Sequence, residues 1–271
     1  MKTCPKCHSE NPNEANFCMN CGMPIDSQKM QNIEPLTFYY ESTEKIQSKF
    51  IDVYTREHEF ANGKGKVRLL DRTPLIWNNA FAYCEGLTSI VIPNCVQKIG
   101  DGAFQGCKNL SRVFIPDSVT EIGWCAFSEC TNLLEIVIPN SVVKIGSWAF
   151  DGCISLNSVV IPNSVVRIGS WAFDGCTSLN SVVIPESVEN IESRAFCYCS
   201  NLKSIEIRNS ETVIGNYAFE GCKMLTSVVI PESLSNIGKN AFCDCDSLPK
   251  EIKEKLSKRN ETTLVEDDLP F

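Results

Sequence analysis

The sequence is short of histidine, of long apolar runs and of positive charge. His8 and His58 are the two histidines in 271 residues, and neither lies near a serine or cysteine that recurs with a base and an orienting acid. Residues 62–66, NGKGK, lack the spacing and the following Ser or Thr of a phosphate-binding loop. No pair of catalytic carboxylates can be identified from spacing. The sequence therefore predicts a protein that is not an enzyme.

The formal net charge of −8 argues against a general binder of nucleic acids or anionic membranes, because such surfaces are usually basic. No apolar run approaches the roughly 20 residues that span a bilayer. The first ten residues, MKTCPKCHSE, lack the apolar core of an export signal. We therefore expect a cytoplasmic protein without a membrane-spanning segment.

Cysteine, in contrast, is abundant. Sixteen cysteines in an exported chain would suggest disulfides, whereas in a cytoplasmic chain metal binding and buried thiols are favoured. Cys4, Cys7, Cys18 and Cys21 form two C-x2-C pairs separated by ten residues. Two such pairs can complete a closed tetrahedral site, so the sequence predicts a structural Zn²⁺ site rather than a redox pair.

Residues 1–24 resemble the short zinc-ribbon module found at the N-terminus of many prokaryotic proteins, and residues 25–35 are predicted to be a linker. Metal must supply the folding energy of so short a segment. Zinc ribbons bind nucleic acid or protein, or only fold. Nucleic-acid binding is disfavoured here by charge balance, since Lys2, Lys6 and Lys29 stand against Glu10, Glu14 and Asp26.

Most of the chain is one repeat. The pair Ala-Phe recurs eight times at intervals of 23 residues, with a Cys three residues after each Phe and a Leu three residues after each Cys. Two neighbouring units, residues 138–160 and 161–183, differ only at Lys144/Arg167 and Ile154/Thr177. A fixed period of this length indicates a solenoid.

Each unit contains a strand pattern. The segment LNSVVIP places Leu156, Val159 and Ile161 on one side, so stacked units would form a parallel sheet with strands about 4.8 Å apart. The proline ends each strand, and a serine two residues later is expected to satisfy backbone groups of the turn. The glycine of the following Ile-Gly pair indicates either a positive φ or a close backbone approach.

Residues 76–248 resemble the BspA-like leucine-rich repeat family, whose unit reads LxxIxIPxSVxxIGxxAFxxC. The resemblance implies a β-rich, right-handed superhelix with short helical turns and an open, concave strand face. Members of this family are often surface-exposed and bind proteins. The resemblance extends upstream to a β-rich N-terminal cap over residues 36–75.

Both ends of the solenoid need a cover. Asn62-Gly63 predicts a hairpin turn between strands in the N-terminal cap, with a helix over residues 45–54 as the competing interpretation. At the other end, Ser247 can cap a helix over residues 249–259 that presents Ile252 and Leu256 to the last coil. Residues 260–271 form an acidic tail for which composition predicts disorder.

Stacking would bring the repeat cysteines about 5 Å apart, within disulfide reach. One interpretation is a row of cysteines that undergoes redox chemistry or binds metal. The other, favoured in a reducing compartment, is that cysteine serves as a small apolar side chain that fills a tight turn. This cysteine column consists of Cys84, Cys107, Cys130, Cys153, Cys176, Cys199, Cys222 and Cys245. Cys197 and Cys243 stand apart, since each directly follows a Phe in a turn expected to be exposed and reactive.

The open strand face is the candidate partner surface. Its outward apolar positions include Phe114, Val137, Val160 and Val183, with Phe114 the best single contact candidate because it replaces Val by an aromatic. Charged residues flank them: Arg112, Glu135, Lys203 and Arg208. Cross-strand stacking that only stabilises the sheet explains the same pattern equally well. Trp148 and Trp171 occupy a variable repeat position that is expected on the surface.

The sequence therefore predicts a non-catalytic, monomeric, intracellular scaffold that binds another protein through the concave face of its solenoid. One alternative is a nucleic-acid-associated regulator that binds through the zinc ribbon. A second alternative is a surface or adhesion protein exported without a recognisable signal.

Overall fold

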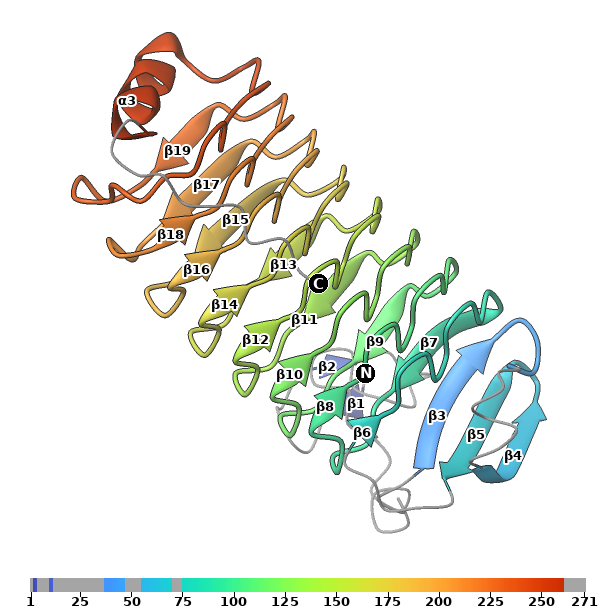
Figure 1. Cartoon of the computed structure of the whole chain (residues 1–271). Coiled ribbons are helices and arrows are strands. Elements are labelled where there is room, and N and C mark those ends of the chain that lie inside the picture. The colour runs from blue at the N-terminus through green and yellow to red at the C-terminus, as the bar shows by residue number, and fades with distance from the viewer. Residues whose placement is uncertain (1, 4–9, 12–36, 47–54, 70–74, 261–271) are drawn as a thin grey trace.

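The computed structural model describes residues 2–3, 10–11, 37–46, 55–69 and 75–260. These residues form an elongated stack of coils, with a small antiparallel sheet at one end and one helix at the other (Figure 1). Each coil is one 23-residue repeat. Among the described residues no helix has the length and apolarity needed to cross a membrane.

One side of the stack consists of parallel strands, which we call the strand face. Residues pair with those 23 positions along the chain, as in Ile136 with Val159 and Val182 with Ile205. The predicted inward residues Leu156, Val159 and Ile161 are buried. Its strands are β7 (Leu87–Val91), β9 (Arg112–Phe114), β11 (Glu135–Val137), β13 (Ser158–Val160), β15 (Ser181–Ile184), β17 (Ser204–Ile207) and β19 (Ser227–Val229). They pair in three groups, β7 with β9, β11 with β13, and β15 with β17 and β19.

A second parallel sheet, which the sequence analysis did not predict, runs along another side of every coil. Its strands have two residues each, one inward and one outward, such as buried Ile145 and exposed Lys144. They are paired in one continuous seven-stranded sheet. Its members are β6 (Leu75–Ile76), β8 (Lys98–Ile99), β10 (Glu121–Ile122), β12 (Lys144–Ile145), β14 (Arg167–Ile168), β16 (Asn190–Ile191) and β18 (Val213–Ile214).

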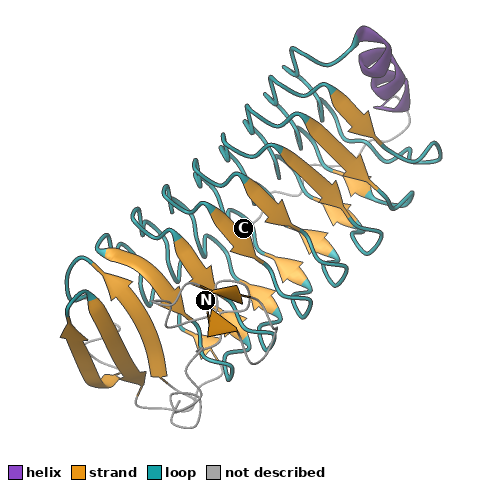
Figure 2. Ribbon diagram, turned by 180° about the vertical axis from the view of Figure 1, so that it is seen from behind, coloured by secondary structure: helices purple, strands orange, loops and turns teal. Residues whose placement is uncertain are grey.

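The third side of each coil is a turn segment, residues 146–156 in one coil, which we call the turn face (Figure 2). Backbone hydrogen bonds join residues three apart in this segment; for example, the Ala149 N–H donates to the Gly146 carbonyl (3.3 Å). The short helical turns implied by the resemblance are limited to such single turns. Two residues per coil have positive φ, Trp148 (54°) and Gly152 (67°), and a left-handed residue breaks a right-handed helix.

The glycine that follows most of the second-sheet strands allows a close approach of neighbouring coils; Trp77 and Glu192 follow the other two. A Cβ built on Gly146 would lie 2.6 Å from the carbonyl carbon of Gly123, a contact too short for any side chain. No positive φ is found at this position. Of the two explanations offered by the sequence, close backbone approach is therefore correct. The predicted serine bonds form in three coils, where the hydroxyls of Ser118, Ser141 and Ser164 donate to backbone carbonyls at 2.5–2.7 Å. The equivalent Ser187 hydroxyl is buried without a partner.

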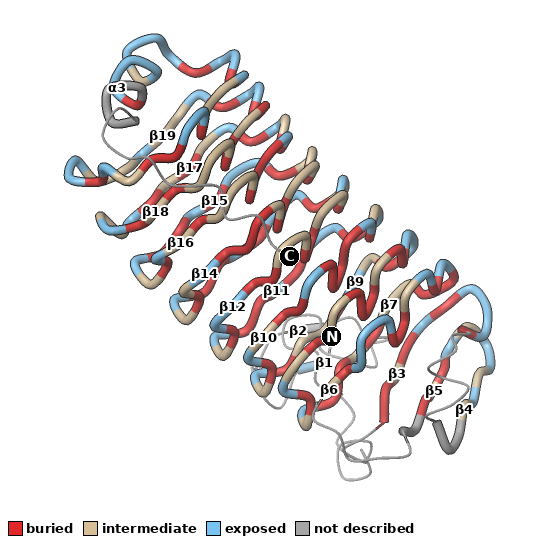
Figure 3. The backbone as a smooth tube through the Cα atoms, in the orientation of Figure 1, coloured by how far each residue is buried: buried red, intermediate tan, exposed pale blue. Residues whose placement is uncertain are grey.

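A column of phenylalanine rings occupies the core between the three sides, where Figure 3 shows buried residues in every coil. Neighbouring rings lie parallel, with centroids 5.0–5.4 Å apart. We call it the phenylalanine stack: Phe81, Phe104, Phe127, Phe150, Phe173, Phe196, Phe219 and Phe242. Ala149 and its equivalents leave room for these rings and are themselves fully buried.

The N-terminal end is covered by β3 (Thr37–Ser42), β4 (Thr55–Ala61) and β5 (Lys64–Leu69). β3 lies between β5 and β7 and runs antiparallel to both, so it extends the strand face. The predicted hairpin joins β4 to β5 through Asn62 (φ 52°) and Gly63 (φ 74°). Most of the competing helix, over 47–54, lies outside the described residues.

The C-terminal end is covered by α3 (Lys250–Asn260), which begins one residue later than predicted. Leu256 is buried and Ile252 packs against the core, so the predicted face of the helix is the one that closes the last coil. The acidic tail, 261–271, lies outside the described residues, as does the predicted linker at 25–35.

Candidate functional site

The predicted zinc ligands Cys4, Cys7, Cys18 and Cys21 lie outside the described residues. The structure does place β1 (Lys2–Thr3) antiparallel to β2 (Glu10–Asn11), so two strands flank the first C-x2-C pair. The donor set is four thiols and fits Zn²⁺, which four thiolates bind with no open position. Such a site stabilises a fold and leaves no place for a substrate.

The strand face presents a column of exposed valines. The exposed fractions are 61% for Val137, 69% for Val160, 40% for Val183 and 57% for Val229. Sequence reasoning placed these side chains outward, and the structure agrees. Leu134, half exposed and next to Glu135 in the sequence, was not predicted. Val137, Val160 and Val183 follow one another on neighbouring strands, whereas Glu206 stands between Val183 and Val229. A solvent-facing apolar column of this kind is what a protein partner can bury.

Phe114 was expected to be a fully exposed aromatic, but its side chain is half-buried; its role as a contact residue stays a prediction. The residue pairs with Val91, which pairs in turn with Tyr39 of β3. Because β3 continues the sheet past the first coil, side chains at this end cover one another. The most accessible apolar residue of the strand face is instead Val160.

The predicted flanking charges of the strand face are all exposed: Arg112, Glu135, Lys203 and Arg208. Arg208 pairs with Glu206 of the same strand (2.9 Å between Nε and Oε1), so its charge is locally compensated. The apolar column is therefore bordered by both signs of charge, a common arrangement around a protein interface.

The predicted indole pair is present on the turn face. The rings of Trp148 and Trp171 stack at 4.5 Å and 8°, and Trp124 packs edge-on to Trp148 at 5.9 Å. The Arg194 guanidinium continues the column, lying 5.6 Å from the Trp171 ring and 4.7 Å from the ring of Tyr217. This arrangement is a cation–π stack along consecutive coils.

The repeat position of these indoles is defined by backbone conformation rather than by exposure. Trp148 and Trp171 are half-buried, and Cys125 at the same position is 5% exposed, so the expected common surface location is wrong. What the members share is a φ between 51° and 60°. Asn79 and Gly102, which occupy this repeat position, could have indicated the positive φ from the sequence, because both residue types favour left-handed backbone.

The cysteine column is buried throughout, with free thiols. Each thiol from the second coil onward donates to the carbonyl of a phenylalanine in the preceding coil, as Cys153 does to Phe127 at 3.2 Å. Burial raises the pKa of Cys84 to about 11 and raises the pKa of Cys153 further. These observations favour the packing interpretation of the column over a redox or metal wire.

Cys197 was expected in an exposed turn, and this is wrong: its side chain is fully buried. Burial, followed by the charge of Asp174, raises its thiol pKa, and the thiol lies 3.4 Å from a Glu220 carboxylate oxygen. Cys243 is half-buried, and burial raises its pKa to about 11. Neither thiol has the lowered pKa of a reactive cysteine.

A column of carboxylates, which the sequence analysis missed, lies next to the indoles. Asp151 accepts a hydrogen bond from the Ser128 hydroxyl (3.2 Å). Asp174, one coil further, stands between Asp151 and Cys197, and its Oδ1 atom is buried without a hydrogen-bond partner. Burial, and then repulsion from Asp151, raises the pKa of Asp174 to about 6.

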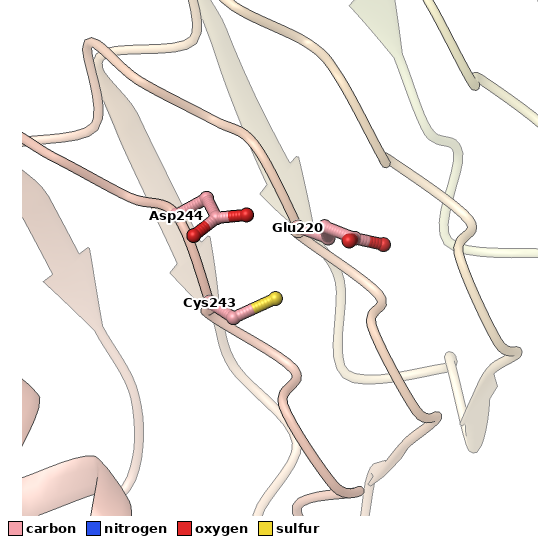
Figure 4. Close-up of side chains that lie close together, drawn as sticks. All are labelled: Glu220, Cys243 and Asp244. Carbon is pink, nitrogen blue, oxygen red and sulfur yellow. The ribbon is translucent and has the colours of Figure 1, made fainter.

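The same column ends in a group of possible metal ligands (Figure 4). Atoms of Glu220, Cys243 and Asp244 lie within 4.8 Å of one another. The Glu220 carboxylate, however, already accepts from the buried Cys197 thiol and pairs with Arg194 at 3.6 Å. Both contacts are made by Oε2, and three exposed or half-buried groups without a further observation do not define a metal site, so we assign no metal to this group.

Two protein-family models match the chain, one over the N-terminal segment and one over the repeats. A family model described as "BspA type Leucine rich repeat region" matches in six copies over residues 74–165 and 125–249. A model described as a zinc-ribbon domain matches residues 3–25. No curated protein matches the chain. No catalytic family is among these matches.

Two solved structures are similar to this chain. A leucine-rich repeat protein of T. pallidum is 29% identical, with a TM-score of 0.55, over 80% of this chain and 96% of that chain. A leucine-rich cell surface protein of Faecalibacterium prausnitzii A2-165 is 28% identical, with a TM-score of 0.39, over 63% of this chain and 62% of that chain. The first similarity supports the solenoid assignment.

Proposed function

We propose that this chain, which belongs to the family of BspA type leucine-rich repeat proteins, is a non-catalytic protein whose strand face binds another protein. The observation that carries the proposal is the exposed valine column of Val137, Val160, Val183 and Val229. Repeats of this kind bury one face of each strand and leave the other available for a partner.

The apolar column is suited to the centre of an interface, and the flanking charges to its rim. Val160 lies between Val137 and Val183, so its side chain would be surrounded by other contact residues once a partner is bound. Side chains at the centre of an interface contribute most of the binding energy, and rim charges mainly govern specificity and association rate. Lys203, Arg208, Arg112 and Glu135 would take that second role.

The zinc ribbon is proposed to bind one structural Zn²⁺ through Cys4, Cys7, Cys18 and Cys21. The ion, when bound, supplies folding free energy to a segment too short for a core of its own. We further propose that the protein acts in the cytoplasm, because the buried thiols of its cysteine column form no disulfide, as a reducing compartment favours. We propose that it does so as a monomer.

The test compares two valine-to-aspartate variants. Val160→Asp places a charge in the middle of the strand face, whereas Val143→Asp places one at a similarly exposed valine (48%) beside the second sheet. A partner captured by wild-type protein in quantitative affinity capture from the cytoplasm of the source cells should be lost with Val160→Asp and retained with Val143→Asp. Identical partner profiles for both variants would refute the strand-face proposal. Nucleic-acid binding that strengthens as salt falls would favour the ribbon-based alternative.

A further inference from the structure

We propose that the turn face carries a second binding surface, specific for an arginine side chain of a partner protein. It is built from the indole and carboxylate columns in the middle of the solenoid, and we call it the Trp–Asp strip: Glu129, Trp148, Asp151, Trp171, Asp174 and Tyr198. The strip lies on a different side of each coil from the strand face, so variants can test the two surfaces separately.

The molecule contains an example of the proposed interaction one coil further along the same columns. Arg194 occupies the repeat position of Trp148 and Trp171, and Glu220 occupies that of Asp151 and Asp174. The guanidinium of Arg194 lies over the Trp171 ring and reaches the Glu220 carboxylate at 3.6 Å. An aromatic ring and a carboxylate at these positions therefore accommodate a guanidinium.

In the two preceding coils the arginine is replaced by tryptophan. Among the described residues neither Asp151 nor Asp174 forms an ion pair within 4.0 Å, although the charge of Arg194 acts on Asp174 and lowers its pKa. The Asp151 carboxylate accepts from the neutral Ser128 hydroxyl, and the Oδ1 atom of Asp174 is buried without a partner. A buried carboxylate oxygen without a donor is costly, so a donor supplied from outside would stabilise the site. The two aspartates are one coil apart, a separation that the forked N–H groups of one guanidinium can bridge.

Access to these carboxylates depends on the small residues beside them. At the repeat position of Gly152 and Gly175, a built Cβ would meet no atom closer than 3.7 Å and 3.9 Å respectively. At Gly106 and Gly221 of other coils the same place is filled by the rings of Tyr83 and Tyr198. The two middle coils are therefore uncovered, and Tyr198, 53% exposed, marks one end of the opening.

The remaining members of the strip select the ligand. Exposed Glu129 adds a third negative charge beside Asp151. Trp148 and Trp171 stack on each other, so a partner's aliphatic stem would pack along the ring edges while its guanidinium binds the carboxylates. A hard divalent cation would require six or more oxygen ligands, which these side chains do not assemble. A planar, weakly hydrated cation with several donors fits better.

The experiment titrates the full-length, zinc-loaded protein with an acetylated tetra-arginine peptide at pH 7.5, followed by calorimetry and by tryptophan fluorescence. Tetra-citrulline, similar in shape but uncharged, serves as the control peptide. We expect Asp151→Asn/Asp174→Asn to weaken tetra-arginine binding by about tenfold or more. Glu85→Gln removes a turn-face carboxylate already paired with Lys108 (3.1 Å) and should leave binding unchanged.

Equal losses with Glu85→Gln and with the double variant would overturn the proposal, because they would indicate attraction by net charge alone. Equal binding of tetra-citrulline, no binding by wild type, or displacement of the peptide by millimolar Ca²⁺ alone would overturn it as well. If the double variant does not fold, Glu129→Gln replaces it, since Glu129 is exposed; we expect a loss of about threefold. Val160→Asp should not change peptide binding, which separates failure of this surface from failure of the strand face.

Discussion

Replacing Phe150 with alanine would open a gap in the middle of the phenylalanine stack. The side chain is fully buried and stacks on both sides, at 5.4 Å from Phe127 and 5.1 Å from Phe173. A buried Phe-to-Ala change costs about 3–5 kcal/mol, and each stacked ring pair about 0.5–1.5 kcal/mol beyond the buried area. Because both neighbours are held by their own coils, the gap cannot close. We expect a loss near the upper end, about 4–5 kcal/mol.

The matched control lies at the end of the same stack. Phe242 is half-buried and stacks on Phe219 alone, at 5.2 Å. Phe242→Ala should therefore cost about half as much, roughly 2 kcal/mol. The assay is urea unfolding followed by circular dichroism, with the breadth of the transition recorded, because repeat arrays can unfold in segments. Equal costs for the two variants, or a cost below about 1 kcal/mol for Phe150→Ala, would refute the reasoning.

Three further predictions concern titratable groups and metal. In the folded, zinc-bound protein the cysteine column should resist thiol reagents because its thiols are buried, although a hydrogen bond with Cys222 lowers the pKa of Cys245. Mass spectrometry should find early labelling confined to half-buried Cys95 and Cys243, and rapid labelling of the column would contradict this. Chelation should release one Zn²⁺ per chain, and Cys4→Ser should abolish Zn²⁺ binding; atomic absorption measures the zinc content in both cases. Neither change should alter the melting temperature of the solenoid. The pKa of Asp174 is raised to about 6, above its unfolded value of roughly 4, so its contribution to stability is present below pH 4 and lost as pH rises through 6. Asp174→Asn should remove that loss, measured as a smaller difference between unfolding midpoints at pH 4.5 and 7.5.

The sequence was most informative where the repeat fixes burial. The 23-residue period and the Leu-x-x-Val-x-Ile spacing place Leu156, Val159 and Ile161 inward, and all three are buried. The outward positions of Val137 and Val160 followed from the same alternation. Reasoning from the period succeeds here because equivalent residues of the eight coils share the same pattern of burial.

It was least informative where a contact involves two coils or a very short element. Strands of two residues, such as Lys144–Ile145, are too short for alternation to be visible, so the second sheet was missed. Cys197 was placed at the surface because its own coil suggests an exposed turn, but Asp174 and Glu220 of the adjacent coils flank its thiol. The pairing of β3 with β7, next to the strand of Phe114, likewise depends on a segment far upstream in the sequence.

The two nearly identical coils, residues 138–160 and 161–183, make the length of this molecule adjustable in fixed steps. Every coil bonds to its neighbours through the same register, so a gene that gains or loses one such unit would encode a protein whose sheets still close. Each added unit would contribute one more valine to the strand face and one more Trp and Asp to the turn face. Recombination between the two repeats would thus change the number of binding positions while leaving both ends of the solenoid, and their covers, untouched.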